Sequence, residues 1–260
     1  MGKLLDMLEK ASRGAVQPLG FGGGGRREKV APMLLLGAVQ AGDEAQAKLV
    51  LEAGLDAAIV VAKGAKAADL TKSTKALGEA VFGVWQEQAQ AEAVEGCEFQ
   101  VFTSDATPIA ALSGEERTNV MQVVPELDDS LLRTIDHLPV DAFLVSLADA
   151  ESLTVAQLMR LARVRGVTSR WLLVHLRALP SKEELEQFRD AGVGGIVVSV
   201  EGQSLEALKA CRETLLGLPH EAPDRDKGKG RSFATLPSVV EGPRPSRQAP
   251  EPDEDDWDDD

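Results

Sequence analysis

Short runs of apolar residues, many of them β-branched, alternate along the chain with segments in which apolar residues recur at helical spacing. The clearest example runs from Arg170 to Val200, where RWLLVHL and GGIVVSV flank a helical segment. Ser181 and Glu184 have the spacing of a capping box, which marks a helix start. Gly192 supplies the left-handed residue that ends such a helix. The stretch therefore predicts a strand, a helix and a second strand, which is the parallel β–α–β unit.

The same alternation covers most of the chain. Eight strands are predicted, at Met33–Gln40, Ala57–Ala62, Val81–Trp85, Phe99–Thr103, Asn119–Val124, Ala142–Leu147, Trp171–Leu176 and Gly195–Val200. Eight helices are predicted between and after them, at Asp43–Ala53, Ala68–Leu77, Ala89–Glu95, Pro108–Leu112, Ser130–Leu138, Leu153–Arg165, Lys182–Ala191 and Leu205–Leu216. The strands are rich in Val, Leu and Ile, as expected for strands covered on both faces.

Helix–turn–strand segments also resemble one another in sequence. EAGLDAAIVV at residues 52–61 is nearly repeated by DAGVGGIVVSV at 190–200, and more weakly by PVDAFLVSL at 139–147. Such recurrence favours a single closed (β/α)8 barrel, the TIM barrel. An open doubly wound sheet is the alternative, but the GxGxxG expected after its first strand is absent.

Residue pairs at predicted helix starts support this register. Asp43 with Gln46 forms a capping pair, and Thr107 before Pro108 fits an N-cap followed by proline at the first helical position. Gly54 is a stop signal that matches the one after the helix at 182–191.

The predicted barrel spans residues 31–218, and three other segments lie outside it. Residues 1–13 predict an amphipathic helix that packs against the barrel through Leu4, Leu8 and Ala11. Residues 14–30 are glycine-rich and lack the GKS or GKT ending of a phosphate loop, so we expect a linker. Residues 219–260 hold seven of the thirteen prolines and end in an acidic run, which predicts a disordered tail.

More than half of the net charge of −14 comes from the last ten residues. Residues 251–260 contribute −8, so the rest of the chain carries only −6. Because the rest of the chain is mildly acidic and phosphate binding needs clustered lysine and arginine, we do not expect a nucleic-acid partner. Cys97 and Cys211 have no metal-ligand spacing, which indicates inert thiols in a reducing compartment. No apolar run reaches the roughly 18 residues of a membrane span. We expect a cytoplasmic protein with no membrane partner.

The functional groups of a (β/α)8 barrel lie at the carboxyl ends of its strands and in the loops that follow. Several polar residues occupy these positions in the predicted barrel. They are Gln40, Lys63, Glu87, Asp105, Glu126, Ser146, Asp149, His175, Arg177, Ser199 and Glu201.

His175 is the strongest catalytic candidate in this set. If Leu172, Val174 and Leu176 face the helices, alternation directs His175 and Arg177 into the barrel mouth. A histidine beside an arginine suits proton transfer next to an anionic substrate. A packed histidine bonded to a neighbouring strand is the alternative.

Two further residues are candidates for catalysis. Lys63 has the chemistry for a Schiff base or for anion binding, although a solvated lysine in the flexible loop that continues to Lys66 is the simpler interpretation. Asp105 follows the predicted fourth strand and is a candidate acid or base.

Carboxylates follow three consecutive predicted strands, at Glu87, Asp105 and Glu126. This placement resembles the magnesium site of enolase-type barrels, which implies Mg²⁺ as the bound ion, since carboxylates prefer hard cations. Ordinary solvated loop acids are the alternative, and nothing in the sequence requires a cofactor.

The AGV-GG-IVV run at residues 191–198 resembles the late strands of phosphate-binding TIM barrels such as indole-glycerol-phosphate and thiamine-phosphate synthases. This resemblance implies an anion site near the last two strands, helped by a helix N-terminus. The loop after the seventh strand has no glycine there, and Arg177 is a possible substitute. The predicted substrate-binding residues are Gln40, Arg177, Ser199, Glu201, Gly202 and Ser204.

Together these features predict a lyase or isomerase acting on a small anionic metabolite, phosphorylated or carboxylated. Convergence of His175, Arg177 and Glu201 in an open pocket would support this hypothesis, and a mouth plugged by bulky apolar side chains such as Trp85 would refute it. The alternative is a non-catalytic barrel that binds a ligand or serves as a scaffold. In that case the acidic residues 251–260 with Trp257 could bind a protein partner, unless the tail only aids solubility.

Overall fold

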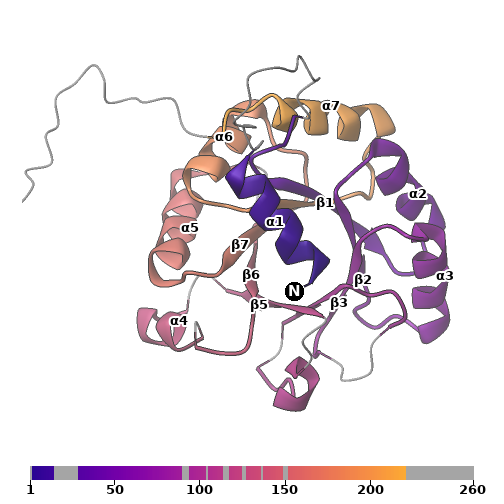
Figure 1. The fold of residues 1–260 in the computed structure, drawn as a ribbon, viewed down its shortest axis with the longest axis horizontal. Coiled ribbons are helices and arrows are strands. Elements are labelled where there is room, and N and C mark those ends of the chain that lie inside the picture. The colour runs from indigo at the N-terminus through magenta and orange to yellow at the C-terminus, as the bar shows by residue number, and fades with distance from the viewer. Residues whose placement is uncertain are drawn as a thin grey trace, which may run out of the picture. The chain divides into compact units, whose positions relative to one another are not determined.

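The computed structural model describes residues 2–14, 29–89, 94–103, 105–113, 117–124, 127–135, 137–148 and 152–220. Eight parallel strands pair in sequence order, and the first strand also pairs with the eighth, so the sheet closes on itself. Figure 1 shows the strands ringed by helices, with α1 lying in front of the barrel. The predicted single (β/α)8 barrel is confirmed.

Each predicted strand is present, and no strand end differs from the predicted one by more than one residue. The strands are β1 Leu34–Gln40, β2 Ala57–Val61, β3 Phe82–Gln86, β4 Phe99–Phe102, β5 Thr118–Val123, β6 Ala142–Ser146, β7 Trp171–Leu176 and β8 Gly195–Ser199. The strand prediction succeeds because both faces of each strand are buried, which leaves long apolar runs in the sequence.

Seven helices are present among the described residues. They are α1 Lys3–Arg13, α2 Glu44–Ala53, α3 Ala67–Leu77, α4 Asp129–Ile135, α5 Val155–Val167, α6 Lys182–Asp190 and α7 Leu205–Leu216. Of the helix predicted at Ala89–Glu95, residues 90–93 lie outside the described residues. No helix of the described chain is long and apolar enough to cross a membrane.

The helix predicted at Pro108–Leu112 is wrong, because the chain forms only a single 3₁₀ turn there, η1 Ile109–Leu112. Side chains of the barrel donate hydrogen bonds to the last carbonyls of this turn. Gln100 donates to the carbonyl of Ala111 at 2.9 Å, and Asn119 donates to the carbonyl of Leu112 at 3.0 Å. An α-helix would need these carbonyls for its own N–H groups if it continued.

The predicted N-cap at Thr107 is also wrong. The Thr107 hydroxyl accepts a hydrogen bond from the backbone N–H of Ala89 at 3.3 Å, and the turn η1 begins without a side-chain cap. This bond joins the loop after β3 to the loop after β4. A threonine before a proline gives no indication of so distant a partner.

Two other predicted helix starts are confirmed. Ser181 and Glu184 form a complete capping box at α6, and the second carboxylate oxygen of Glu184 accepts from the N–H of Leu153 at 3.0 Å. Asp43 caps α2 by accepting from the N–H groups of Ala45 and Gln46. The Gln46 side chain accepts instead from the N–H of Gln40 at 2.9 Å, which ties the end of β1 to α2.

The internal repeat reflects one recurring backbone contact. One residue directly precedes each of β2, β6 and β8, and its backbone N–H donates to a carbonyl of the preceding strand at 2.8–2.9 Å. The acceptor is in each case the second residue of that preceding strand. In two copies the donor residue is an aspartate, and its carboxylate also accepts from the N–H of the same partner. Asp56 accepts from Leu35 at 2.7 Å, and Asp141 accepts from Asn119 at 2.8 Å.

The third copy has Gly194 in place of the aspartate. A Cβ atom at Gly194 would lie 2.9 Å from the Trp171 ring and 3.2 Å from the side chain of Leu8. The ring of Trp171 and the side chain of Leu8, from β7 and α1, therefore fill the space that a carboxylate would need. Packing of α1 against the barrel explains why the repeat departs from aspartate at this position.

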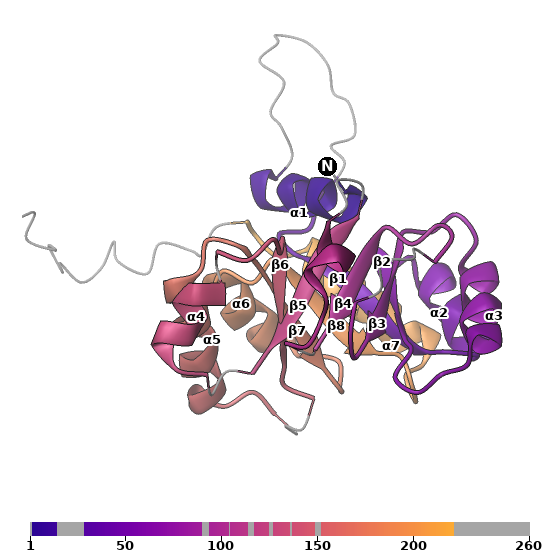
Figure 2. The same cartoon turned by 90° about the horizontal axis from the view of Figure 1, so that it is seen from below.

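The helix α1 covers the amino-terminal end of the barrel, as Figure 2 shows. Leu4 and Leu8 are fully buried, and Ala11 is nearly so. Together with Leu34 of β1 they belong to the same apolar cluster as the barrel interior. The amphipathic pattern of residues 1–13 therefore arises because one face of the helix closes the barrel.

The interior of the barrel is filled by apolar side chains that alternate with the helix-facing ones. Inward residues include Leu36, Ile59, Phe99, Val101, Val120, Leu144, Leu173 and Val197, all fully buried. Gly83 of β3 leaves room for the Phe99 ring, whose atoms would lie 2.3 Å from an added Cβ. The barrel is thus packed from α1 nearly to the opposite end, without a through-channel.

Replacing Leu8 by alanine should destabilise the protein, because it opens a cavity between α1 and the barrel. We expect a loss of about 2–5 kcal/mol in the free energy of unfolding, measured by urea denaturation. The exposed Ser12 of the same helix provides the control, and Ser12→Ala should change stability by less than about 0.5 kcal/mol. Equal effects of the two substitutions would show that α1 does not seal the barrel.

Burial raises the pKa of Asp56 above 3.8, against the opposing effects of the Leu35 N–H and the Arg212 guanidinium. The native state therefore binds this proton more tightly than the unfolded chain, so stability falls as pH rises from 3.8 through the native pKa. Asp56→Asn should remove this slope in urea denaturation between about pH 3.5 and about pH 6. Asp141→Asn removes the equivalent hydrogen-bonding carboxylate and is the matched control. A constant stability difference between Asp56→Asn and the parent protein over this range would contradict the prediction.

Candidate functional site

A cavity of about 210 Å³ opens at the carboxyl end of the barrel, the end opposite α1. We call it the mouth cavity. Its lining comes from seven strands and from the loop after β2. The lining residues are Ala38, Gln40, Val61, Lys63, Trp85, Gln122, Ser146, His175 and Ser199. This is the position at which (β/α)8 barrels carry their functional groups.

These side chains reach the cavity because they continue the inward-facing series of each strand. In β7, Leu173 faces the lumen and His175 follows it two residues later, while Leu172 and Val174 pack against the helices. The inward series of β6 and β8 likewise change from Leu144 to Ser146 and from Val197 to Ser199. The lumen therefore changes from apolar to polar over the last inward residues of these strands.

His175 is held between two serines on the neighbouring strands. Its Nδ1 lies 3.1 Å from the Ser146 hydroxyl and its Nε2 lies 3.1 Å from the Ser199 hydroxyl. In a neutral imidazole one nitrogen donates and the other accepts, so one serine accepts a hydrogen bond and the other donates one. The expectation that alternation directs His175 into the mouth agrees with this geometry, and the bonds to neighbouring strands were the stated alternative role.

Trp85 spans the lumen and forms the floor of the mouth cavity. Its strand, β3, lies opposite β7 in the barrel, and its ring meets the His175 ring edge-on with centroids 5.0 Å apart. The side chain is only 4% exposed. The ammonium group of Lys63 lies 5.6 Å from the centre of the same ring, a cation–π distance. Trp85 thus occupies the bottom of the mouth and leaves the space above it open.

Lys63 gives the mouth cavity its charge. Among the described residues that line it there is no carboxylate, and Lys63 is the one lysine or arginine. Serine hydroxyls, two glutamine amides and the indole surround the remaining space. The cavity is therefore suited to an anion more than to a cation.

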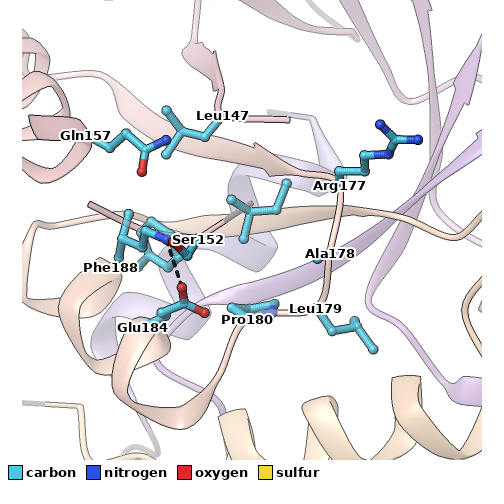
Figure 3. A pocket seen from close by; sticks show the side chains of 11 residues that line it. Leu147, Ser152, Gln157, Arg177, Ala178, Leu179, Pro180, Glu184 and Phe188 are labelled. Atoms are coloured by element: carbon cyan, nitrogen blue, oxygen red, sulfur yellow. Dashed lines mark hydrogen bonds between the residues drawn. The ribbon is translucent and has the colours of Figure 1, made fainter. Parts of the chain in front are cut away.

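Arg177 lies in a different place from His175. The strand β7 ends at Leu176, so Arg177 belongs to the following loop, where alternation along the strand no longer directs its side chain. It lines a smaller cavity of about 50 Å³ beside α6, with Leu176, Pro180 and Phe188 among the other lining residues. Figure 3 shows its guanidinium extending away from Glu184 and Phe188.

The loop after β8 also contributes nothing to the mouth cavity. Glu201 and Gly202 are exposed in a turn closed by the Gln203 N–H, which donates to the Val200 carbonyl at 3.0 Å. The Ser204 hydroxyl caps α7 by accepting from the N–H of Ala207. His175, Arg177 and Glu201 therefore do not converge in one pocket.

The two described carboxylates among those considered for Mg²⁺, Glu87 and Asp105, are not part of a metal site. Glu87 and Asp105 are exposed, whereas Glu126 and the loop residue Asp149 lie outside the described residues. Within the described part of the chain, no group of three or more His, Cys, Asp or Glu residues is placed to hold a metal ion.

Neither cysteine lines the mouth cavity. Burial raises the pKa of Cys211 to about 11, and burial also raises the pKa of Cys97. Both thiols are consequently protonated near neutral pH, which makes them poor nucleophiles.

Gln122 is a lining residue that the sequence analysis missed. It lies two residues after Val120, which faces the lumen, so the alternation in β5 directs Gln122 into the mouth. The signal was present in the sequence, but Gln122 lies before the end of the predicted strand rather than beyond it.

No protein-family model and no curated protein sequence matches the chain. Among solved structures, tryptophan synthase from M. tuberculosis in its open form superposes with a TM-score of 0.55 at 16% identity, over 71% of this chain and 91% of that chain. A mutant tryptophan synthase alpha-subunit from Pyrococcus furiosus gives a TM-score of 0.55 at 17% identity, over 71% and 98% of the two chains. GGGPS from Thermoplasma volcanium gives a TM-score of 0.53 at 13% identity, over 84% and 97%. Similarity at this level shows the fold, and the chain is a (β/α)8 TIM barrel.

Proposed function

We propose that the mouth cavity binds a small anionic metabolite, carboxylated or phosphorylated, and that the protein is a lyase or isomerase in which His175 moves a proton. The observation that carries this proposal is the pair of serines that fix His175 in a cavity whose charge comes from Lys63. A fixed imidazole next to a bound anion suits general acid–base chemistry.

The proton would pass through one of the two serines. Both ring nitrogens of His175 face serine hydroxyls, so a substrate does not need to touch the ring. As a substrate C–H bond breaks, its proton moves to the serine oxygen, and the serine proton moves to the imidazole nitrogen. The electron pair stays on the substrate, where Lys63 can stabilise the negative charge that develops.

Only part of the substrate-binding set expected from the sequence enters this proposal. Gln40 and Ser199 line the mouth cavity together with Lys63. Arg177, Glu201, Gly202 and Ser204 receive no role in it, and neither does the exposed Asp105. The resemblance to phosphate-binding barrels and the structural likeness to tryptophan synthase support an enzyme scaffold rather than a particular substrate.

A non-catalytic, ligand-binding barrel is the second candidate. Trp85 occupies the lumen directly beside His175, and the part of the cavity lining that the structure describes holds no carboxylate to act as a second acid or base. The ring of His175 could then serve only to join β6, β7 and β8. Partner binding through residues 251–260 stays a prediction, because these residues lie outside the described part of the chain.

Anion binding is tested by a thermal-shift screen against phosphorylated and carboxylated metabolites. A ligand present at about 100 times its Kd stabilises by about 2.7 kcal/mol, which should raise the melting temperature by several degrees. Lys63→Met should abolish the shift, whereas Lys66→Met, which removes an exposed lysine of the same loop, should retain it. A screen without any shift, or shifts that survive Lys63→Met, would overturn the proposal.

Catalysis is tested with any metabolite that binds, by following exchange of its protons with solvent in D₂O by NMR. The parent protein should catalyse exchange, and His175→Gln should slow it by at least about 100-fold while leaving Kd largely unchanged. Gln keeps a hydrogen-bonding group for the serines, so the fold should be retained. Binding without exchange or turnover in the parent protein would instead support the non-catalytic barrel.

A further inference from the structure

The floor and wall of the mouth cavity carry two buried polar atoms without a partner. The indole Nε1 of Trp85 and the amide Oε1 of Gln122 are shielded from solvent, and neither forms a hydrogen bond within the described residues. Both side chains line the mouth cavity, from β3 and β5. Buried polar atoms are rarely left unpaired in folded proteins, since each costs about 1–3 kcal/mol when it loses water without gaining a partner.

The nearby hydroxyl groups do not meet this need. Ser146 and Ser199 are engaged with the two nitrogens of His175. Lys63 contacts the π face of Trp85, and its exposed ammonium group remains accessible to a ligand. Neither atom is in contact with the open space of the cavity, so a molecule that enters it can pair with both atoms only after the side chains of Trp85 and Gln122 turn.

The chemistry of the two atoms defines what such a molecule must present. An indole N–H can only donate, so the ligand must bring an acceptor to Trp85. A charged oxygen is the best acceptor there, because the Lys63 ammonium lies 5.6 Å from the centre of the same ring. An amide oxygen can only accept, so the ligand must bring a donor to Gln122. A hydroxyl group suits this position better than an ammonium group, which Lys63 would repel.

We propose that the mouth cavity selects a small hydroxylated oxyanion, such as a hydroxy acid. One oxygen of the anionic group accepts from Trp85 Nε1 and Lys63 Nζ, and a hydroxyl group of the same molecule donates to Gln122 Oε1. The cavity volume of about 210 Å³ is below the roughly 300–1,000 Å³ of sites for drug-sized ligands, which limits the ligand to a small metabolite. This assignment rests on the proposed function for the location of the site and adds the class of ligand.

The test compares probes that differ in one kind of group. Glycerate and propionate share a carboxylate and differ in hydroxyl groups, glycerol lacks the anion, and inorganic phosphate supplies a second oxyanion. Titrations of the full chain by calorimetry give the affinities, and tryptophan fluorescence reports binding at Trp85. We expect glycerate to bind about tenfold more tightly than propionate and glycerol not to bind.

Variants assign the selectivity to the two atoms. Gln122→Met removes the amide oxygen at similar volume. The affinity for glycerate should therefore fall about tenfold, to that for propionate, whose Kd stays unchanged. Trp85→Phe keeps an aromatic ring without the N–H and should lower the affinity for both acids about tenfold. Trp171→Phe, at the opposite end of the barrel, should leave all affinities unaltered. Melting curves check that each variant is folded, and Gln122→Met alone suffices if Trp85→Phe fails to fold.

The outcomes distinguish hydroxyl selection from the proposed anion-binding function on which it rests. Equal affinity for glycerate and propionate, with both lost in Lys63→Met, would refute hydroxyl selection and leave anion binding intact. An unchanged preference for glycerate in Gln122→Met would also refute it. If the two acids, phosphate and every metabolite of the thermal-shift screen fail to bind, the proposed function is overturned as well.

Discussion

The structure depends on the closure of its sheet, in which β8 pairs with β1 after six intervening strands have been added in order. Closure removes both sheet edges and creates a lumen that side chains must fill. Leu, Val, Ile and Phe side chains fill it along most of its length, and Gly83 makes room for Phe99. The helix α1 completes this packing by covering the amino-terminal end with Leu4 and Leu8.

This packing confines the polar chemistry to one place. Because the lumen below Trp85 is apolar, inward-facing polar groups such as Ser146, His175 and Ser199 gather at the carboxyl ends of the strands. There they contact one another directly. The two serines hydrogen-bond to the imidazole, and the Trp85 and His175 rings pack edge to face. Among the described residues, the Trp85 N–H and the Gln122 oxygen have no hydrogen-bond partner. These unpaired atoms in side chains that line a cavity support the proposal that the mouth binds a small molecule.

Three positions at the amino-terminal end of the barrel show how one repeat fits different surroundings. Asp56 and Asp141 each clamp the second residue of the preceding strand through side chain and backbone. At Gly194 the backbone bond remains, but Trp171 and Leu8 occupy the space of the carboxylate. At this one copy of the repeat, the packing of α1 and Trp171 therefore leaves room for glycine and not for aspartate.

The sequence by itself determined the positions of the strands and most helix ends, because burial on two faces leaves long apolar runs and because capping residues act on near neighbours. It also placed His175 in the mouth through strict alternation along β7. Only the tertiary structure decided which polar residues meet. Arg177 lies one residue beyond the strand and leaves the mouth, Thr107 bonds to Ala89, and Trp85 reaches His175 across the barrel. These contacts join residues far apart in the chain, and their geometry depends on the closed barrel rather than on any local pattern.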